Sequence, residues 1–196
     1  MDYSKLNQIS KLNNKKFPFK EVIKNIENCD VLPFANAKLL KILKNACKNT
    51  IEPVNNVEFS GRPNEFGNIV ANLFGVECKK LGLDYQKPKD FQGRGKENGY
   101  PDGLLIFKEE YIYIELKTCE ENKQNQTLRT FFYSPSSNSK ITYDASHLLI
   151  CFLTAKKNNA LLLNGNFHFV DMYEKDVKLK LEYNSNNKEL YSGKLL

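Results

Sequence analysis

GYPDGLLIFKEEYIYIELKT, residues 99–118, is the stretch from which the expected fold follows. It contains two apolar segments, residues 102–107 and 111–117, which are separated by the polar residues 108–110. Short apolar runs on either side of a polar turn are typical of a β-hairpin. The stretch therefore predicts two antiparallel strands, and the second of them alternates between apolar and polar positions near its end.

Three ionisable residues are expected at one end of this hairpin. Side chains two residues apart in a strand point to the same face, so Glu115 and Lys117 share a face and Leu116 points away from it. The start of the first strand lies beside the end of the second, which brings Asp102 to the same place. Two neighbouring carboxylates repel each other, and a hard cation such as Mg²⁺ relieves that repulsion. A lysine beside the cation can hold a water or stabilise charge on a phosphate. The trio therefore indicates phosphodiester hydrolysis, and the alternative is a surface hairpin with solvated charged ends.

The same residues resemble the signature of a known superfamily. Pro101 and Asp102, the hairpin, and then Glu115, Leu116 and Lys117 are similar to the pattern of the PD-(D/E)XK nucleases, which include many type II restriction endonucleases. The resemblance implies an α/β fold with a central mixed β-sheet flanked by helices, a restriction-endonuclease-like core with a catalytic β-hairpin. It implies that Asp102, Glu115 and Lys117 are catalytic, that the two acids hold Mg²⁺, and that the substrate is double-stranded DNA. One such site per chain predicts a homodimer for cutting both strands of a palindrome.

Length and composition agree with this interpretation without proving it. With 196 residues the chain is expected to form a single nuclease domain, with a helical part (1–60), a catalytic core (61–155) and a β-rich C-terminal part (156–196). The net charge of +6 suits a polyanionic partner, although a lysine-rich composition also follows from an AT-rich genome. Five scattered cysteines without a C-x-x-C pair fit a reducing cytoplasm. No apolar run is long enough to span a bilayer, so no membrane association is expected.

Helices are expected mainly before the hairpin. Apolar spacing predicts a helix over 19–26, a second helix that begins at Pro33, and a third from Pro63 to about Leu81. Residues 51–62 are predicted to be a connector, and a short strand is expected over 83–86.

One acid in the third of these helices is a candidate for the metal site. Members of the superfamily often place a helix before the catalytic sheet, and that helix can carry an additional acid. The resemblance assigns this role to Glu65, with Asn68 on the same face as a secondary candidate. The alternative is that Glu65 is an ordinary acid favoured by the positive N-terminus of the helix.

Two polar segments beside the hairpin are candidates for DNA contact. Residues 87–100 are basic and glycine-rich, and residues 128–145 combine aromatic, basic and hydroxyl side chains around Pro135. Such side chains contact phosphates and base edges, and the alternative is two solvated surface loops. Pro135 and its serines also argue against the helix that superfamily cores usually place here. The candidate DNA-binding residues are Lys89, Arg94, Lys96, Asn98, Arg129, Tyr133, Ser134, Ser136, Asn138 and Lys140.

The rest of the chain carries no predicted chemistry. A buried strand is expected over 147–153, and the runs ALLL, FHFVDMY and VKLKLEY after residue 159 are expected to be strands. His147 is expected to be structural or on the surface, and His168 to be packed between two phenylalanines.

The sequence thus predicts a Mg²⁺-dependent type II restriction endonuclease in the cytoplasm. Three alternatives stay open. The first is a structure-specific or repair nuclease of the same fold, such as a junction resolvase. The second is a basic DNA-binding protein without catalysis, and the third is an accessory module of a larger defence complex.

Overall fold

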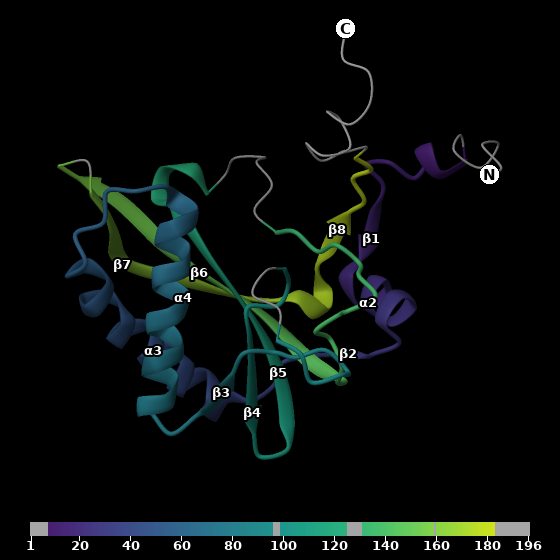
Figure 1. The fold of residues 1–196 in the computed structure, drawn as a ribbon, viewed down its shortest axis with the longest axis horizontal. Helices are drawn as coiled ribbons and strands as arrows, with labels where there is room; N and C mark the ends of the chain where they lie inside the picture. The colour runs from purple at the N-terminus through teal and green to yellow at the C-terminus, as the bar shows by residue number, and fades with distance from the viewer. Residues whose placement is uncertain (1–7, 96–98, 125–130, 159, 183–196) are drawn as a thin grey trace, which may run out of the picture.

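The fold is given by a computed structural model that describes residues 8–95, 99–124, 131–158 and 160–182 (Figure 1). In chain order the elements are β1 (Lys16–Pro18), α2 (Phe19–Glu27), β2 (Val31–Leu32), α3 (Ala37–Asn55), α4 (Pro63–Lys80), β3 (Asp84–Gln86), β4 (Gly103–Phe107), β5 (Glu110–Glu120), η1 (Glu121–Lys123), β6 (Ala145–Lys157), β7 (Ala160–Asp171), η2 (Met172–Glu174) and β8 (Asp176–Lys178).

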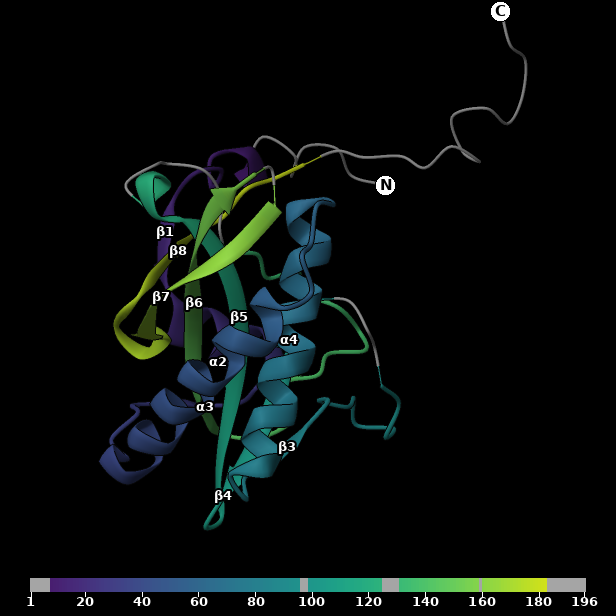
Figure 2. The ribbon, with the colours of Figure 1, turned by 90° about the vertical axis from the view of Figure 1, so that its left-hand side faces the viewer.

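A mixed sheet forms the centre of the molecule. The described residues build a six-stranded sheet in the order β2-β6-β5-β4-β3, with β7 paired to β6. β6 runs parallel to β2 and β5, whereas β3–β4, β4–β5 and β6–β7 are antiparallel pairs. Helices α3 and α4 cover one face of this sheet, and β1 and β8 form a separate two-stranded sheet beside α2 (Figures 1 and 2). The predicted α/β fold with a central mixed sheet is confirmed.

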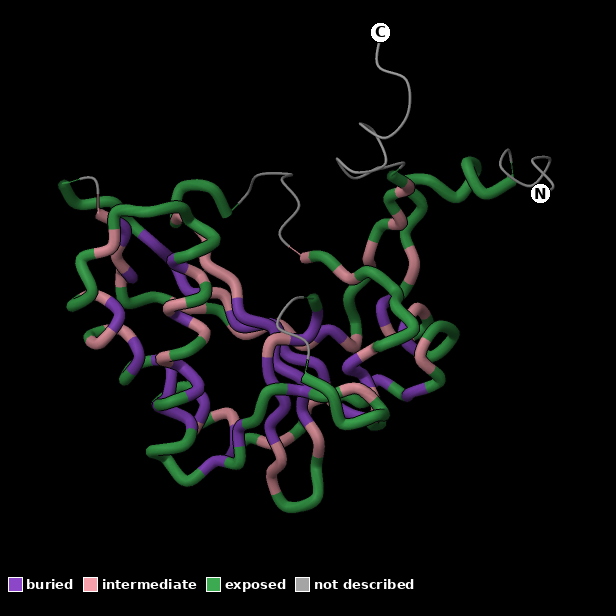
Figure 3. Tube along the Cα trace, in the orientation of Figure 1, coloured by how far each residue is buried: buried purple, intermediate pink, exposed green. Residues whose placement is uncertain are grey.

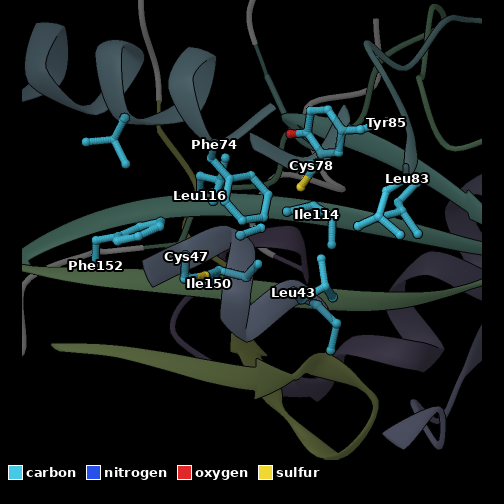
Figure 4. Packing of buried hydrophobic residues seen from close by; sticks show 14 of the residues in the cluster. Leu43, Cys47, Phe74, Cys78, Leu83, Tyr85, Ile114, Leu116, Ile150 and Phe152 are labelled. Atoms are coloured by element: carbon cyan, nitrogen blue, oxygen red, sulfur yellow. The ribbon is translucent and has the colours of Figure 1, made fainter. Parts of the chain in front are cut away.

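Strict alternation along the central strands divides the buried side chains between the two faces. On β5, Ile112, Ile114 and Leu116 point toward α3 and α4, where they join the larger of two apolar clusters (Figure 4). Tyr113 lies between them and points to the other face, where Phe19 of α2 belongs to the second cluster. Figure 3 shows that burial is concentrated on β4, β5 and β6, whereas the tip of the hairpin is exposed. A strand that is apolar on both faces is buried on both faces.

The predicted hairpin is confirmed, with a tighter turn than expected. Strand β4 pairs with β5 from Gly103↔Ile114 to Phe107↔Glu110. Lys108 and Glu109 alone form the turn, with φ of 49° and 68°. Two consecutive left-handed residues are typical of a type I′ turn, whose twist matches that of the strands it joins. Glu110, which was predicted to be a turn residue, therefore begins β5.

The second long helix differs from the prediction at both ends. It begins at Ala37 rather than at Pro33, because Asn36 caps it by accepting a hydrogen bond from the N–H of Leu39 at 3.0 Å. It also continues through Pro53 to Asn55, so the first part of the predicted connector is helical.

A contact between residues far apart in the sequence explains why α3 extends to Asn55. The Asn55 amide donates to the carbonyl of Leu163 at 3.0 Å and accepts from its N–H at 2.8 Å. This pair of bonds anchors the last turn of α3 on β7.

The C-terminal strands are longer and fewer than predicted. ALLL and FHFVD belong to one strand, β7, and VKLKLEY contributes only to the short β8. The prediction for His168 is wrong, because its side chain is exposed and its Nε2 lies 2.9 Å from Oε1 of Gln124. In the described part of the connection between β5 and β6, the only helical element is the 3₁₀ turn η1. This agrees with the expectation, based on Pro135, that the connection lacks the helix usual in superfamily cores. Across the described ranges, no helix combines the length and the apolar character needed to cross a membrane.

His147 is a buried structural residue, in agreement with one of the two predictions for it. It is 0 % exposed, and its Nδ1 lies 2.6 Å from the Tyr100 hydroxyl. Its ring also packs against those of Phe19 and Tyr113. Burial lowers the pKa of His147 to about 3. The imidazole is therefore neutral in the folded protein above about pH 3, whereas in the unfolded chain it becomes charged below about pH 6.5.

We expect this histidine to make the protein less stable as the pH falls. Because the folded pKa lies below the unfolded value of about 6.5, its contribution is complete above that pH and decreases toward pH 3. Between pH 7 and pH 5 the loss amounts to about 2 kcal/mol. Urea unfolding of the wild type and of His147→Gln at both pH values measures this loss as a difference, because Glu115, whose pKa is raised to about 7, shifts the stability in the opposite direction over the same range. His147→Gln should show a smaller loss than the wild type, and His168→Gln, which removes the exposed histidine, should behave like the wild type. Equal acid sensitivity of His147→Gln and the wild type would contradict the assignment.

Candidate active site

Asp102 is fixed at the junction of the two hairpin strands. Its backbone N–H donates to the carbonyl of Ile114 at 3.0 Å and extends the β4–β5 ladder by one residue. Its Oδ2 accepts the N–H of Leu116 at 2.8 Å. The carboxylate of Asp102 is thus held directly on β5, beside Glu115. The expectation that the hairpin brings these two acids together agrees with this geometry.

Glu115 and Lys117 form an ion pair on one face of β5. The Lys117 Nζ lies 2.5 Å from Oε1 of Glu115. The Glu115 side chain is only 5 % exposed, whereas 27 % of the Lys117 side chain is exposed. The acid therefore lies inside the site and the lysine at its opening. A buried carboxylate gains more from such a pair than a surface carboxylate does, because the surrounding dielectric is lower.

The environment of Glu115 favours a neutralising partner. Burial raises its pKa to about 7, and the negative charge of Asp102 acts in the same direction. Lys117 opposes the shift, and Lys140 does so to a smaller extent. The second oxygen, Oε2, is buried and has no hydrogen-bond partner among the residues that the structure describes. A buried oxygen without a partner is costly, so this atom needs either a proton or a cation.

The donor set fits a hard divalent cation. Asp102 and Glu115 offer carboxylate oxygens, and Oε2 of Glu115 is available for a ligand. Within the described ranges no group of three His, Cys, Asp or Glu residues is suited to hold a metal ion. Mg²⁺ is commonly held by only one or two carboxylates, with waters and substrate phosphates as its other ligands. Two acids are therefore sufficient for this ion, and Asp102 and Glu115 are the residues that would hold it.

Glu65 is not brought to the other two acids. It lies in the exposed first turn of α4, and its Oε2 accepts the N–H of Arg62 at 3.2 Å. Helix α4 packs on the sheet face of Thr118, which lies close to Gly67, whereas Glu115 points to the opposite face. Asn68 is exposed on the same helix. Among the described residues Glu65 therefore acts as a helix cap, and a role at the metal site stays a prediction.

A tyrosine that the sequence analysis did not single out packs against the residue that follows Asp102. A Cβ atom at Gly103 would lie 2.1 Å from the hydroxyl oxygen of Tyr85, so only glycine fits directly after Asp102. Burial raises the pKa of Tyr85, and the charges of Asp102 and Glu115 add to this effect. The available signal was the glycine itself, because a glycine inside a strand often marks a close approach by another group.

The two predicted DNA-contact segments meet beside the site. Arg94 donates from Nη2 to Oδ1 of Asn138 at 3.1 Å and from Nε to Oδ2 of Asp90 at 2.9 Å. Lys89 is exposed and pairs with Gly95 through a backbone bridge. The predicted residues Lys96, Asn98 and Arg129 lie outside the described residues. Arg94 and Asn138, far apart in the sequence, are thus held together on one exposed surface.

The remaining predicted contact residues do not all lie on the surface. Ser134 and Ser136 are exposed, and the Tyr133 hydroxyl donates to Oε1 of Glu27. Lys140 is only 4 % exposed, so it does not occupy the surface position that the sequence predicts. Lys140 lines a pocket of about 260 Å³ together with residues that include Ser134, Asn138 and Tyr100.

A mixed sheet with a hairpin that gathers Asp102, Glu115 and Lys117 defines a restriction-endonuclease-like protein. Comparison with known proteins makes this more specific. Residues 11–194 match the Type II restriction enzyme MjaV family, and the chain belongs to that family. It is also similar to the Type II restriction enzyme MjaV of Methanocaldococcus jannaschii, with 29 % identity in an alignment that covers 93 % of this chain and 88 % of the relative.

Proposed function

We propose that this protein is a Mg²⁺-dependent endonuclease that cleaves double-stranded DNA at a specific short sequence. The observation that carries the proposal is the convergence of Asp102, Glu115 and Lys117 at one end of the β4–β5 hairpin. Membership of a restriction enzyme family supports the substrate class. The positive net charge of +6 is in accord with a polyanionic partner.

In this mechanism each residue of the trio has a separate task. Asp102 and Glu115 would hold the cation, and Leu116 keeps the Asp102 carboxylate in position through its N–H. When bound, the cation would supply Lewis-acid stabilisation of the charge on the scissile phosphate. Lys117, at the opening of the site, is placed to orient an attacking water or to stabilise the growing negative charge. Its ion pair with Glu115 fixes the position of the ammonium group before substrate arrives.

DNA contact is assigned to the two segments that meet at Arg94 and Asn138. Both residues are exposed, and the Arg94 guanidinium is oriented by two hydrogen bonds. Phe91 lies nearby in the sequence and is 74 % exposed, which is unusual for a large apolar side chain. Exposed aromatic rings beside basic groups suit stacking on nucleic-acid bases. Base readout and phosphate contact are both proposed for this surface.

Assembly and location follow from the same function. One trio per chain cuts one strand, so cleavage of both strands at a palindrome requires two copies related by a twofold axis. A homodimer is therefore part of the proposal. All five cysteines are free, and three of them are buried. Free thiols fit the reducing cytoplasm, where cellular DNA would be the competing substrate.

The first test is digestion of a plasmid of known sequence. With Mg²⁺ we expect discrete fragments on a gel, and with EDTA in place of Mg²⁺ we expect no cleavage, because without a cation the two carboxylates repel the phosphate and nothing stabilises its growing negative charge. A smear, or cleavage of branched DNA only, would favour a structure-specific nuclease of the same fold. Absence of cleavage with Mg²⁺, Mn²⁺ and Co²⁺ across unrelated plasmids would contradict the proposal.

A further inference from the structure

Lys140 occupies a position that lysine rarely takes. It is 4 % exposed, although lysine is almost never fully buried without a specific role for its charge. Moving an ammonium group out of water is energetically costly unless the protein replaces the lost contacts with water. The segment that carries it is otherwise polar and exposed from Ser134 to Asn138. The burial of this one cation therefore needs a physical reason.

The Lys140 ammonium is bonded to the segment that leads into the active site. Its Nζ donates to the carbonyl oxygen of Gly99 at 2.6 Å. Gly99 stands directly before Tyr100, Pro101 and Asp102, and it adopts a φ of 87°, which suits glycine. Tyr100 is buried and stacks on His147 with an interplanar angle of 14°. The chain segment that precedes Asp102 is thus fixed at both Gly99 and Tyr100.

The segment that follows Lys140 is fixed to β5. The Tyr113 hydroxyl accepts the N–H groups of Thr142 at 2.7 Å and of Tyr143 at 3.2 Å. Ile141, the residue after Lys140, is 0 % exposed. Tyr113 lies on the same face of β5 as Glu115, two residues before it. The backbone that carries Lys140 is therefore attached to the strand that carries the catalytic acid.

The charge of Lys140 also has an electrostatic effect on Glu115. It acts on Glu115 in the same sense as Lys117 and favours the ionised carboxylate. A further positive charge near two carboxylates reduces their mutual repulsion. The position of Lys140 combines this charge with a hydrogen bond to the backbone that precedes Asp102.

We propose that Lys140 is a positioning residue of the nuclease, which ties the carbonyl of Gly99 to the segment anchored on Tyr113 and so holds Asp102 beside Glu115. This inference rests on the proposed function, because it concerns the rate of DNA cleavage. It differs from a DNA-contact role, because the residue is only 4 % exposed and its ammonium is bonded to the carbonyl oxygen of Gly99. A displacement of about 1 Å in a reacting group can cost about 10²-fold in rate.

The test compares Lys140→Met and Lys140→Arg with the wild type, and Lys20→Met is the control. Lys20 is a partly exposed lysine of α2 that pairs with Glu174 at 3.8 Å. Lys140→Met should lower the single-turnover cleavage rate by about 10²-fold. Its dissociation constant for cognate DNA in Ca²⁺ should stay within about threefold of the wild type, because no surface contact is lost. Lys140→Arg, which keeps the charge and the donors, should cleave at least about tenfold faster than Lys140→Met. Hydrogen exchange of the metal-free protein should be faster in Lys140→Met over residues 99–103 and unchanged over α3.

Each outcome separates this inference from the proposed function. If the wild type does not cleave DNA, the proposed function fails. If the wild type cleaves and Lys140→Met keeps its rate and its exchange over 99–103, the positioning role is wrong. A loss confined to DNA affinity would show a contact role and would also overturn it. If Lys140→Met does not fold, Lys140→Gln replaces it, because its amide is too short to reach Gly99 as lysine does; a wild-type rate in that variant would overturn the inference.

Discussion

Replacing Asp102 with Asn is expected to lower the DNA cleavage rate by at least about 10³-fold while the fold is preserved. The amide oxygen of Asn can still accept the N–H of Leu116, so the junction of β4 and β5 keeps its hydrogen bond. What is lost is a negative charge at the proposed cation site. A bound cation there would supply several kcal/mol of charge stabilisation, and each 1.36 kcal/mol is about tenfold in rate. Single-turnover cleavage of a cognate oligonucleotide at saturating enzyme measures the effect.

The same variant should be as stable as the wild type or more stable when no metal is present. Asp102 repels the buried carboxylate of Glu115, and its neutralisation removes that repulsion. A ligand that binds only the folded protein raises its melting temperature. Mg²⁺ should therefore raise the melting temperature of the wild type and have little effect on that of Asp102→Asn.

A matched control is Asp84→Asn. Asp84 is an exposed acid of β3 that accepts a hydrogen bond from the Gln86 amide at 2.8 Å, and it has no place in the proposed mechanism. It should cleave at the wild-type rate and respond to Mg²⁺ as the wild type does. Cleavage by Asp102→Asn within about tenfold of the wild type, or an unchanged response to Mg²⁺, would remove Asp102 from the metal site.

The centre of the fold and the trio could be predicted because they depend on local rules. Alternation along β5 places Glu115 and Lys117 on one face, and hairpin geometry places Asp102 beside them. These relations need only the period of a strand and the position of one turn. The same holds for α4, which begins at Pro63 as its apolar spacing and its proline indicate.

The features that were missed depend on contacts between distant segments. The end of α3 is set by Asn55 on β7, and the interior position of Lys140 is set by Gly99. No periodic pattern in the sequence reports such contacts, so Lys140 had the same polar context as its exposed neighbours. The face to which Glu65 belongs follows from how α4 packs on the sheet, which the spacing within the helix does not determine.

Replacing Lys117 with Ala is expected to lower the cleavage rate by about 10²- to 10⁴-fold, which abolishes cleavage in a standard digest, and to leave DNA binding largely intact. In the proposed mechanism the ammonium, which lies at the opening of the site, acts on the reacting groups, whereas the affinity for DNA is expected to come mainly from contacts along the phosphate backbone. The rate is measured in single turnover with Mg²⁺, and the dissociation constant is measured in Ca²⁺. Lys123→Ala is the control, because Lys123 is an exposed lysine of η1 that pairs with Glu120 at 2.7 Å.

A second effect of this variant has to be separated from the first. Loss of Lys117 removes the ion-pair partner of Glu115, so the pKa of that carboxyl, already raised to about 7 by burial and by Asp102, rises further. A protonated Glu115 would hold a cation less well at neutral pH, and this part of the defect should disappear as the pH is raised to 9 and Mg²⁺ is increased. If Lys117 acts directly on the water or the phosphate, most of the loss persists under those conditions. Full recovery of the rate at high pH and high Mg²⁺ would reduce Lys117 to a counterion of Glu115, and a large loss of DNA affinity would instead place it among the phosphate contacts.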